Sequence, residues 1–578
     1  MRLSEKTSGN HSRFYVIRSV MRNGKRSSEV VEKLGSEEEI KEKYGCTDAR
    51  AWAKKYVEEL NNKNENGTHK VLIPMYTDVR IESEHQSSFN IGYLFLQKIY
   101  HQLGIPYICK KISERHNFEY NLDSILSRLI YGRILFPSSK LSCWQQSKDL
   151  YEQPNFELHQ IYRALSVLAD ESDLIQERLY KNSKKVIGRS TGVLYYDCTN
   201  YFFEIEQEDD LRKYGQEKNH RPNPIVQMGM FIDRSGIPLA FSINPGNTNE
   251  QITLRPLEQR IMRDFELSKF VVCTDGGLSS EPNRKFNNLG ERSFITTHSL
   301  KTKISNELRE WALSPEGWHL KGSHEVFDLR NIGDSEDDYE FIYYKQRYIE
   351  GYDEERNVEF NQTFIVTYSK KYADYQRKLR DQQVDRALKL AKDPSKVDRN
   401  GANDVRRFIK KTKVTKDGEI ADIRAYELDQ HAIDEEAKYD GFYAVYTNLD
   451  DDPEEIVQIN RGRWEIEESF RILKHEFEAR PIYVQRDERI MAHFLTCFMS
   501  LLIYRILEKQ LSEKYTCDKL LSTLRVMRVT EIAGMGFVPS YTRTELTDAL
   551  HENAGFHTDF QFITNKSMKG ICRRSKCL

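Results

Sequence analysis

The chain has 578 residues, of which 39% are hydrophobic and 30% charged, and its formal net charge is −2. This length exceeds one compact core and predicts about three or four domains of a soluble globular protein. The nine cysteines form no C-x-x-C pair, which argues against a zinc ribbon or a thioredoxin-type motif. The near-neutral charge does not exclude a nucleic-acid partner, because a local basic surface is enough to bind phosphates.

Neither the N-terminal stretch nor the longest apolar run predicts a membrane protein. The N-terminal stretch "MRLSEKTSGNHSR" has no apolar segment of the kind found in signal peptides. The longest apolar run, residues 491–507, is short for a bilayer span and is interrupted by His493 and Arg505. We therefore expect a buried core helix there, no membrane partner, and a cytoplasmic protein with reduced thiols.

Residues 1–85 predict a hairpin followed by helices. Asn23-Gly24 separates two strand-like runs, and Ser36 with Glu39 forms a capping box that opens the next helix. Residues 61–70 read as a polar linker. The hairpin could contact DNA or could be a solvated face, and its basic side chains are Arg13, Arg18, Arg22, Lys25 and Arg26.

The rest of the chain predicts an α/β fold behind a helical domain. Apolar positions at helical spacing place that domain at residues 86–188. Strand patterns then follow at 192–204, 225–233 and 237–246, before a helix and a buried strand at 269–277. Three meandering strands and a right-handed crossover to a parallel strand describe a ribonuclease-H-like core. We expect its first part at 189–300, a β-rich insertion at 301–438, its second part at 439–510 and a C-terminal region at 511–578.

Two aspartates lie on strands that this topology makes neighbours. Asp197 lies within the first strand among aromatic and apolar residues, where a carboxylate is costly unless it is paired or binds a cation. Asp275 follows the fourth strand at its carboxyl end, where open α/β sheets build their sites. Either residue alone reads better as a loop cap or an ion-pair partner. Together, they favour a metal site.

The segment "INRGRWEIEESFRILKHEF", residues 459–477, predicts an amphipathic helix. At about 100° per residue, Glu467 shares one narrow face with Asn460, Arg463 and Lys474, beside an apolar stripe at 466, 470, 473 and 477. Glu467 could be a surface ion-pair partner of Arg463, worth a few tenths of a kcal/mol. Alternatively, it could be a third metal ligand, with Arg463 and Lys474 holding phosphates on either side.

Asp197, Asp275 and "NRGRWEIEESFRILK" resemble the DDE triad and the Y-(2)-R-(3)-E-(6)-K signature of bacterial insertion-sequence transposases. The stretches "YGQEKNHRPNPIVQMGMFID", "VVCTDGGLSS" and "ARPIYVQRDERIMAHFL" are similar as well, so the resemblance spans at least residues 190–510. One position departs from the signature, because Asn460 stands where the family has a tyrosine that helps to hold the transposon-end backbone.

The resemblance implies DNA transposition by metal-assisted phosphoryl transfer. Asp197, Asp275 and Glu467 would be both catalytic residues and metal ligands, for Mg²⁺ or for Mn²⁺ as a substitute. Arg463, Lys474 and Asn460 would contact DNA. The implied partners are double-stranded DNA, as the terminal inverted repeats and the target, and a second copy of the chain to pair two ends.

Two other functions remain open. A structure-specific DNA nuclease on the same fold would cut without joining. A non-catalytic DNA-binding derivative is disfavoured, because the three carboxylates and both basic partners are present. The C-terminal "KSMKGICRRSKCL" could add a DNA contact, but a disordered, solvated end is the favoured expectation.

Overall fold

The computed structural model describes residues 2–8, 11–22, 25–65, 71, 73, 77–78, 80, 83–215, 222–302, 304–333, 339–392, 404–414 and 423–577. Over these residues the chain forms two compact units, Met1–His85 and Gln86–Leu578.

The N-terminal unit packs two helices on an antiparallel sheet. Its elements are β1 (Arg2–Ser8), β2 (His11–Arg22), β3 (Lys25–Ser36), α1 (Glu37–Tyr44) and α2 (Ala49–Glu65). Strands β2 and β3 pair as the predicted hairpin, while its turn, Asn23-Gly24, lies outside the described residues. The capping box of Ser36 and Glu39 opens α1 as predicted. Phe14, Ile40, Ala49 and Ala53 give the unit a small core of its own.

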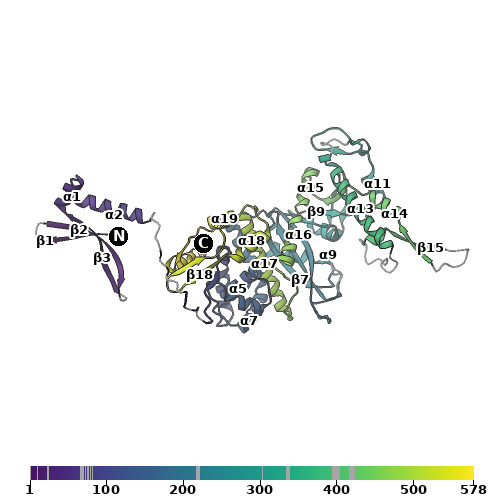
Figure 1. Ribbon diagram of the computed structural model, residues 1–578. Helices are drawn as coiled ribbons and strands as arrows, with labels where there is room; N and C mark the ends of the chain where they lie inside the picture. Colours follow the sequence, from purple (N-terminus) through teal and green to yellow (C-terminus); the bar gives the residue numbers. More distant parts are fainter. Residues whose placement is uncertain are drawn as a thin grey trace. The chain divides into compact units, whose positions relative to one another are not determined.

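The larger unit begins with helices and continues into a sheet (Figure 1). Its first helices and short strand are β4 (Ser88–Asn90), α3 (Tyr93–Gln102), α4 (Ile105–Arg115), α5 (Leu122–Leu135), α6 (Lys140–Ser147), α7 (Leu158–Asp170) and α8 (Ser172–Val186). The next elements are β5 (Val193–Phe202), β6 (Ile225–Asp233), β7 (Pro238–Pro245), α9 (Glu250–Asp264), β8 (Val271–Thr274), η1 (Gly276–Leu278), α10 (Glu281–Asn287) and β9 (Ser293–His298).

The largest sheet of the described residues has nine strands in the order β10-β11-β14-β17-β9-β8-β5-β6-β7. Strands β5, β6 and β7 form an antiparallel meander, and α9 then leads to β8, which pairs parallel to β5. The predicted adjacency of the first and fourth strands is therefore present. Strand β9 continues in parallel on the other side of β8.

Alternating side chains of β5 face two different cores. Leu194, Tyr196 and Cys198 pack with apolar residues of α9. Tyr195 and Tyr201 belong to the main core, together with Ile466, Phe470 and Leu473 of the helical segment after residue 459. Odd-numbered residues of β5 thus face that segment, because neighbouring side chains of a strand point to opposite faces.

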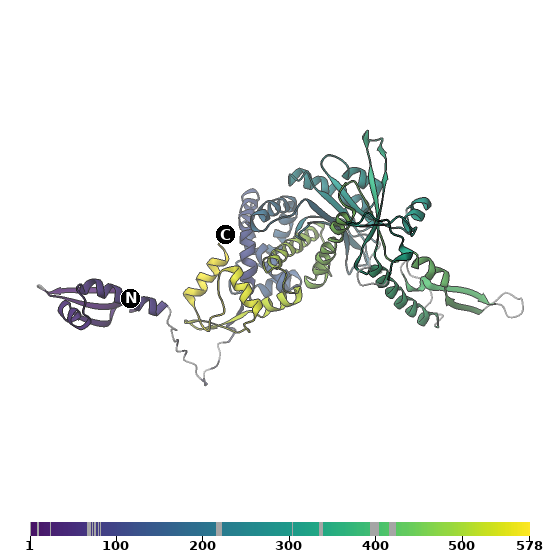
Figure 2. The ribbon, with the colours of Figure 1, turned by 90° about the horizontal axis from the view of Figure 1, so that it is seen from above.

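Residues 301–438, the predicted insertion, add strands to one edge of this sheet. They contain α11 (Asn306–Leu313), β10 (His319–Leu320), η2 (Leu329–Asn331), β11 (Tyr343–Ile349), β12 (Tyr352–Asp353), β13 (Val358–Glu359), β14 (Gln362–Tyr368), α13 (Lys370–Ala391), η4 (Val405–Phe408), β15 (Ile409–Val414), β16 (Ile423–Leu428) and α14 (Gln430–Ala437). Strands β10, β11 and β14 join the main sheet through β17 (Phe442–Thr447), whereas β15 and β16 form a separate hairpin (Figure 2).

The remaining elements run from the sheet to the C-terminus. They are α15 (Pro453–Arg461), α16 (Trp464–Arg471), the π-helical turn η5 (Ile472–Glu476), α17 (Asp487–Gln510), α18 (Cys517–Val526), β18 (Arg528–Ile532), β19 (Gly536–Pro539), α19 (Glu545–Ala554), β20 (Ile563–Thr564) and α20 (Asn565–Ser575).

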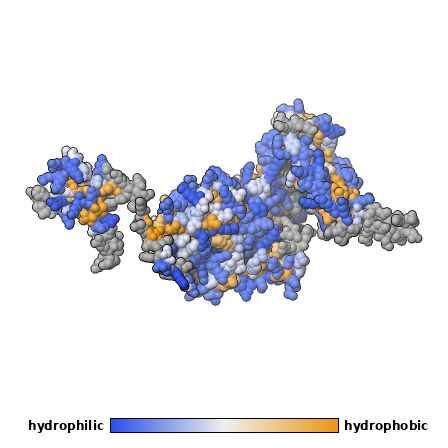
Figure 3. Space-filling model, viewed as in Figure 1, coloured by the Kyte–Doolittle hydropathy of each residue, from blue (hydrophilic) through white to orange (hydrophobic). Residues whose placement is uncertain are grey.

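Helix α17 is the centre of the main core. Among the described residues it is the one helix long and apolar enough to cross a membrane. However, 94% of its most apolar 18-residue stretch is buried inside the protein. It contacts α3, α5, α7 and β7, and the visible face of the larger unit is mainly hydrophilic (Figure 3). The predicted buried core helix is therefore confirmed.

The C-terminal tail is ordered, and the expectation of a disordered end is wrong. Residues Asn565–Ser575 form α20, whose side chains at 568, 571, 572 and 575 are buried. Their spacing makes one apolar stripe, and α20 packs with it against α3. Gln97 on α3 donates to Ser575 Oγ at 3.0 Å.

Candidate active site

Asp197 and Asp275 lie in one row across two parallel strands. The strands pair with Tyr195 opposite Cys273. Asp197 lies two residues further along β5, and Asp275 directly follows Thr274, the last residue of β8. Both side chains therefore belong to the face that carries Tyr195 and Cys273, which is the face of the main core. Neighbouring strands are about 4.8 Å apart, so this register places the two aspartates next to each other at the carboxyl ends of their strands.

Thr297 of β9 continues the same row. Thr274 pairs with Thr296, so the next residues, Asp275 and Thr297, are neighbours at the carboxyl ends of their strands. Arg463, at the start of α16, donates from Nη1 to Thr297 Oγ1 at 3.3 Å. This contact fixes the beginning of α16 above β9.

The other end of the helical segment is fixed on β5. Lys474, in the π-helical turn η5, donates to the hydroxyl of Thr199. Thr199 lies two residues beyond Asp197 on the same face of the strand. The segment from Arg463 to Lys474 thus crosses from β9 to β5, over the row that holds Asp275 and Asp197.

Glu467 lies between these two anchor points and remains accessible. Its side chain is 65% exposed, and its Oε1 lies 3.8 Å from Arg463 Nη2, a loose i,i+4 ion pair. Ile466, Phe470, Leu473 and Phe477 are buried, as the helical pattern predicts. The helix is not continuous, however, because α15 ends at Arg461 and α16 begins at Trp464. Gly462 lies so close to Tyr195 that an added Cβ would be 2.1 Å from the phenol oxygen.

Glu465 is a buried ion-pair partner of α17, and the helical pattern of the sequence did not predict its burial. Its side chain is 11% exposed, and Arg505 of α17 donates to its Oε2 at 3.0 Å. Burial raises the pKa of Glu465, and the Arg505 charge opposes that effect. The sequence places Glu465 away from the apolar stripe, but α17 covers that side of α16 as well.

Asn460 is buried beside the site, with 1% of its surface exposed. Its Nδ2 donates to Tyr443 Oη at 2.6 Å and to Thr297 Oγ1 at 3.0 Å. The two hydroxyl oxygens are themselves 2.9 Å apart. Tyr443, on β17, and Thr297 carry no recognisable sequence signal, because only the sheet brings them to Asn460.

Asp275 also caps the turn that follows its strand. Its Oδ1 accepts from the backbone N–H of Leu278 at 3.1 Å. Asp275 is thereby the N-cap of the short helix η1. Asp197 Oδ1 accepts from the N–H of Cys198 at 2.7 Å. Asp275 is thus the loop cap expected of an isolated aspartate, and it also lies next to Asp197 across the two strands.

The three carboxylates do not form one tight cluster. A different group of three side chains could hold a metal ion among the described residues: His551, His557 and Asp559. Their ligand atoms all lie within 4.8 Å of one another. Sites that bind two metals about 3.5–4 Å apart spread their ligands more widely than that. As a donor set, three carboxylates are the hard oxygen ligands that Mg²⁺ and Mn²⁺ prefer.

Comparison with known proteins finds a family for part of the chain. Residues 350–503 match the family model of the transposase DDE domain. This match supports a DDE-type transposase. The range matched to the DDE domain contains Arg463, Glu467 and Lys474, and it begins after Asp197 and Asp275. No curated protein matches the chain.

A solved structure, the cryo-EM structure of the piggyBac transposase synaptic complex with hairpin DNA, aligns with 84% of this chain and 84% of its own. The two are 10% identical, with a TM-score of 0.35. A TM-score this low carries no argument about the family or the function of this chain.

Proposed function

We propose that the chain is an insertion-sequence transposase that binds the ends of its own element and catalyses strand cleavage and strand transfer. The placement of Glu467 carries the proposal. It lies between Arg463, anchored on Thr297, and Lys474, anchored on Thr199, over the strands that carry Asp197 and Asp275. An accessible carboxylate on a helix that crosses over two neighbouring aspartates is an arrangement suited to metal-dependent chemistry on phosphodiesters.

The proposed fold of the catalytic part is a ribonuclease-H-like core. The meander β5-β6-β7 and the parallel strands β8 and β9 are its strands, and α16 supplies the third carboxylate. Residues 301–438 are the insertion between the strands and that helix. Strands β10, β11 and β14 of this insertion widen the sheet, which supports a rigid connection to the core.

Asp197, Asp275 and Glu467 would hold Mg²⁺, or Mn²⁺ in its place, which would activate a water or a 3′-hydroxyl and stabilise the leaving oxygen. The chain's own basic residues would position the DNA. The Lys474 ammonium donates to Thr199, on the strand of Asp197. The Arg463 guanidinium is 13% exposed and lies beside Glu467. Both would contact phosphates, which orients the DNA without reading its sequence.

Asn460 would act through its neighbour. Its amide is buried, whereas Tyr443, whose hydroxyl it binds, is half-buried. In this proposal Asn460 holds the Tyr443 phenol and Thr297 beside Arg463, and the phenol makes the DNA contact expected at this position. End recognition is assigned to the N-terminal hairpin, where Arg13 and Arg18 are exposed, and pairing of two ends to self-association.

The experiment uses the full chain with DNA carrying the terminal inverted repeats that flank its coding region, in Mg²⁺. We expect cleavage at the repeat ends and joined strand-transfer products. Asp197→Ala, Asp275→Ala and Glu467→Ala should each lower both activities by at least about 100-fold, because each removes a metal ligand.

Glu455→Ala is the matched control, since the Glu455 side chain on α15 is 64% exposed and that of Glu467 is 65% exposed. Cleavage without joined products would identify a nuclease instead. DNA binding without cleavage would identify a non-catalytic derivative. Wild-type activity in Glu467→Ala would overturn the site assignment.

A further inference from the structure

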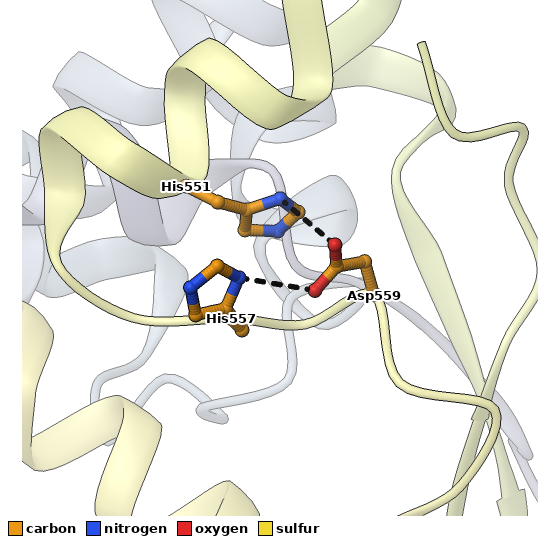
Figure 4. A group of neighbouring side chains, drawn as sticks. All are labelled: His551, His557 and Asp559. Atoms are coloured by element: carbon orange, nitrogen blue, oxygen red, sulfur yellow. Dashed lines mark ion pairs between the residues drawn. The ribbon is translucent and has the colours of Figure 1, made fainter. Parts of the chain in front are cut away.

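Three potential metal ligands meet at the end of α19, in a region that the proposed DNA chemistry does not use. His551 lies on the last turn of α19, and His557 and Asp559 lie in the segment that follows (Figure 4). His557 Nδ1 is 3.3 Å from one carboxylate oxygen of Asp559, and His551 Nδ1 is 3.8 Å from the other. All three side chains point toward a common centre.

His551 has a buried ring nitrogen without a partner. Its side chain is fully buried, and Nδ1 makes no hydrogen bond to any described residue. A buried polar atom left unpaired costs about 1–3 kcal/mol, so it indicates a ligand or a strained site. The 3.8 Å separation from Asp559 is too long for a hydrogen bond.

The other ring nitrogen of His551 determines which tautomer can bind a cation. Nε2 lies 2.9 Å from Thr558 Oγ1, which in turn lies 2.9 Å from Tyr541 Oη. Nε2 also accepts from the backbone N–H of Thr558 at 3.2 Å, which places the ring proton of the metal-free site on Nδ1, facing Asp559. A cation at Nδ1 requires the other tautomer, in which Nε2 carries the proton and donates to Thr558 Oγ1. A hydrogen bond from the second nitrogen is the usual support of a metal-binding histidine.

Charge also favours a cation at this centre. Asp559 is 12% exposed. Arg543 also lies near it, at 3.7 Å, but Arg543 Nε bonds Asp548 at 2.6 Å. The two imidazole rings are stacked 5.4 Å apart. Two neutral imidazole rings can stack this closely and share one cation with the Asp559 carboxylate. Two imidazolium rings at this distance would repel each other.

We propose that His551 Nδ1, His557 Nδ1 and the Asp559 carboxylate bind a transition-metal ion, Zn²⁺ being the best match, with water as the fourth ligand. Two imidazoles and a carboxylate form a donor set that suits Zn²⁺ rather than Mg²⁺. Tetrahedral ligands about 2.0–2.1 Å from Zn²⁺ lie about 3.4 Å from one another. The three ligand atoms of this group all lie within 4.8 Å of one another, so the side chains must close slightly around the ion.

The role of this metal is structural. It ties the segment after α19 to the helix itself, where Phe95 of α3 already contacts the His551 ring at 5.4 Å and the Phe556 ring at 5.1 Å. The metal therefore fixes part of the C-terminal region onto the helical core. The ion is separate from the metal proposed for DNA cleavage, because its ligands differ in place and in type.

The test uses the full chain, stripped of metal with a chelator and titrated with Zn²⁺ or Co²⁺. We expect one tightly bound ion per chain, a rise in Tm on adding Zn²⁺, and a Co²⁺ spectrum of nitrogen and oxygen ligands without thiolate bands. His557→Ala and Asp559→Asn should lose this binding by at least about 10-fold, since each removes one of three protein ligands.

His557 is 52% exposed, so its replacement leaves the core intact, and Tm values of the metal-free variants check folding. His431→Ala is the control, because His431 is 85% exposed on α14. Binding should persist in Asp197→Ala/Asp275→Ala, which keeps the result independent of the proposed active site. No bound ion in the wild type, thiolate bands, or unchanged binding in Asp559→Asn would overturn the proposal.

Discussion

At the residue scale, one buried amide links three elements around the proposed site. Asn460 of α15 donates to Tyr443 on β17 and to Thr297 on β9, and Thr297 also accepts from Arg463. The position of Asn460 in the sequence signature indicates a DNA contact. Its burial assigns it instead the task of holding the hydroxyl groups beside Arg463, because a side chain 1% exposed cannot reach a ligand.

Asn460→Ala should lower the free energy of unfolding by about 2 kcal/mol, since it removes two hydrogen bonds from a buried network. We also expect slower cleavage of the repeat ends, because Arg463 and Tyr443 lose their common support. Tyr443→Phe should slow cleavage with a smaller loss of stability.

Denaturant unfolding and the cleavage assay measure the two effects. Tyr483→Phe serves as the control, because the Tyr483 side chain is 66% exposed. Full activity of Tyr443→Phe would contradict the role assigned to its hydroxyl.

At the element scale, α17 holds α16 through a buried ion network. Arg505 is 2% exposed and donates to Glu465 Oε2 at 3.0 Å, to Ser469 Oγ at 3.1 Å and to Glu508 at 2.7 Å. Glu465 is two residues from Glu467, so this network sets the rotation of α16. One carboxylate is thereby turned inward and the other outward.

Arg505→Met should destabilise the protein by about 3–5 kcal/mol, because Glu465 is left buried without its cation. The pKa of Glu465 is already raised by burial and should rise further in this variant. When the pKa of a carboxyl is higher in the folded than in the unfolded state, the group contributes fully to the stability of the fold below the unfolded-state pKa. This contribution is lost as the pH rises through the folded-state pKa.

The deficit of Arg505→Met relative to the wild type should therefore be smaller at pH 5 than at pH 8, as measured by denaturant midpoints. The double variant Arg505→Met/Glu465→Met should recover much of the loss, because it removes the unpaired charge. A deficit independent of pH would show that Glu465 does not carry the effect.

At the scale of the whole molecule, the chain consists of two units with separate cores. The N-terminal unit, Met1–His85, packs Phe14, Ile40, Ala49 and Ala53 together and stacks the rings of Trp52 and Tyr44 at 4.0 Å. Units with separate cores unfold as separate cooperative steps.

We expect two transitions when the full chain is unfolded by heat or denaturant. A fragment of residues 1–85 should reproduce the smaller one, with dispersed NMR amide signals. A single transition of the full chain, combined with an unfolded fragment, would contradict this division.

Local patterns determined much of the architecture. Strand alternation and turn residues predicted the hairpin of β2 and β3, the meander from β5 to β7, and β8 after α9. Ser36 and Glu39 predicted the start of α1, and a long apolar run predicted α17. These features depend on neighbours within a few residues, which a sequence displays directly.

Contacts between distant segments determined the rest. The same helical pattern could not tell that Glu465 is buried and Glu467 exposed, because α17 closes one side of α16. Asn460 meets Thr297 across 163 residues of sequence. The apolar stripe of α20 is easily overlooked among basic residues, and it becomes a helix because α3 offers it a surface.

The sequence by itself determined the strands and helices, the aspartates at neighbouring strands and the glutamate on a helix. Only the tertiary structure decided which side chains face one another: the anchors of α16 on Thr297 and Thr199, the buried Asn460 and the cluster at His551. The physical reason is that periodicity records which face of an element is apolar, whereas polar contacts depend on which other elements cover that face.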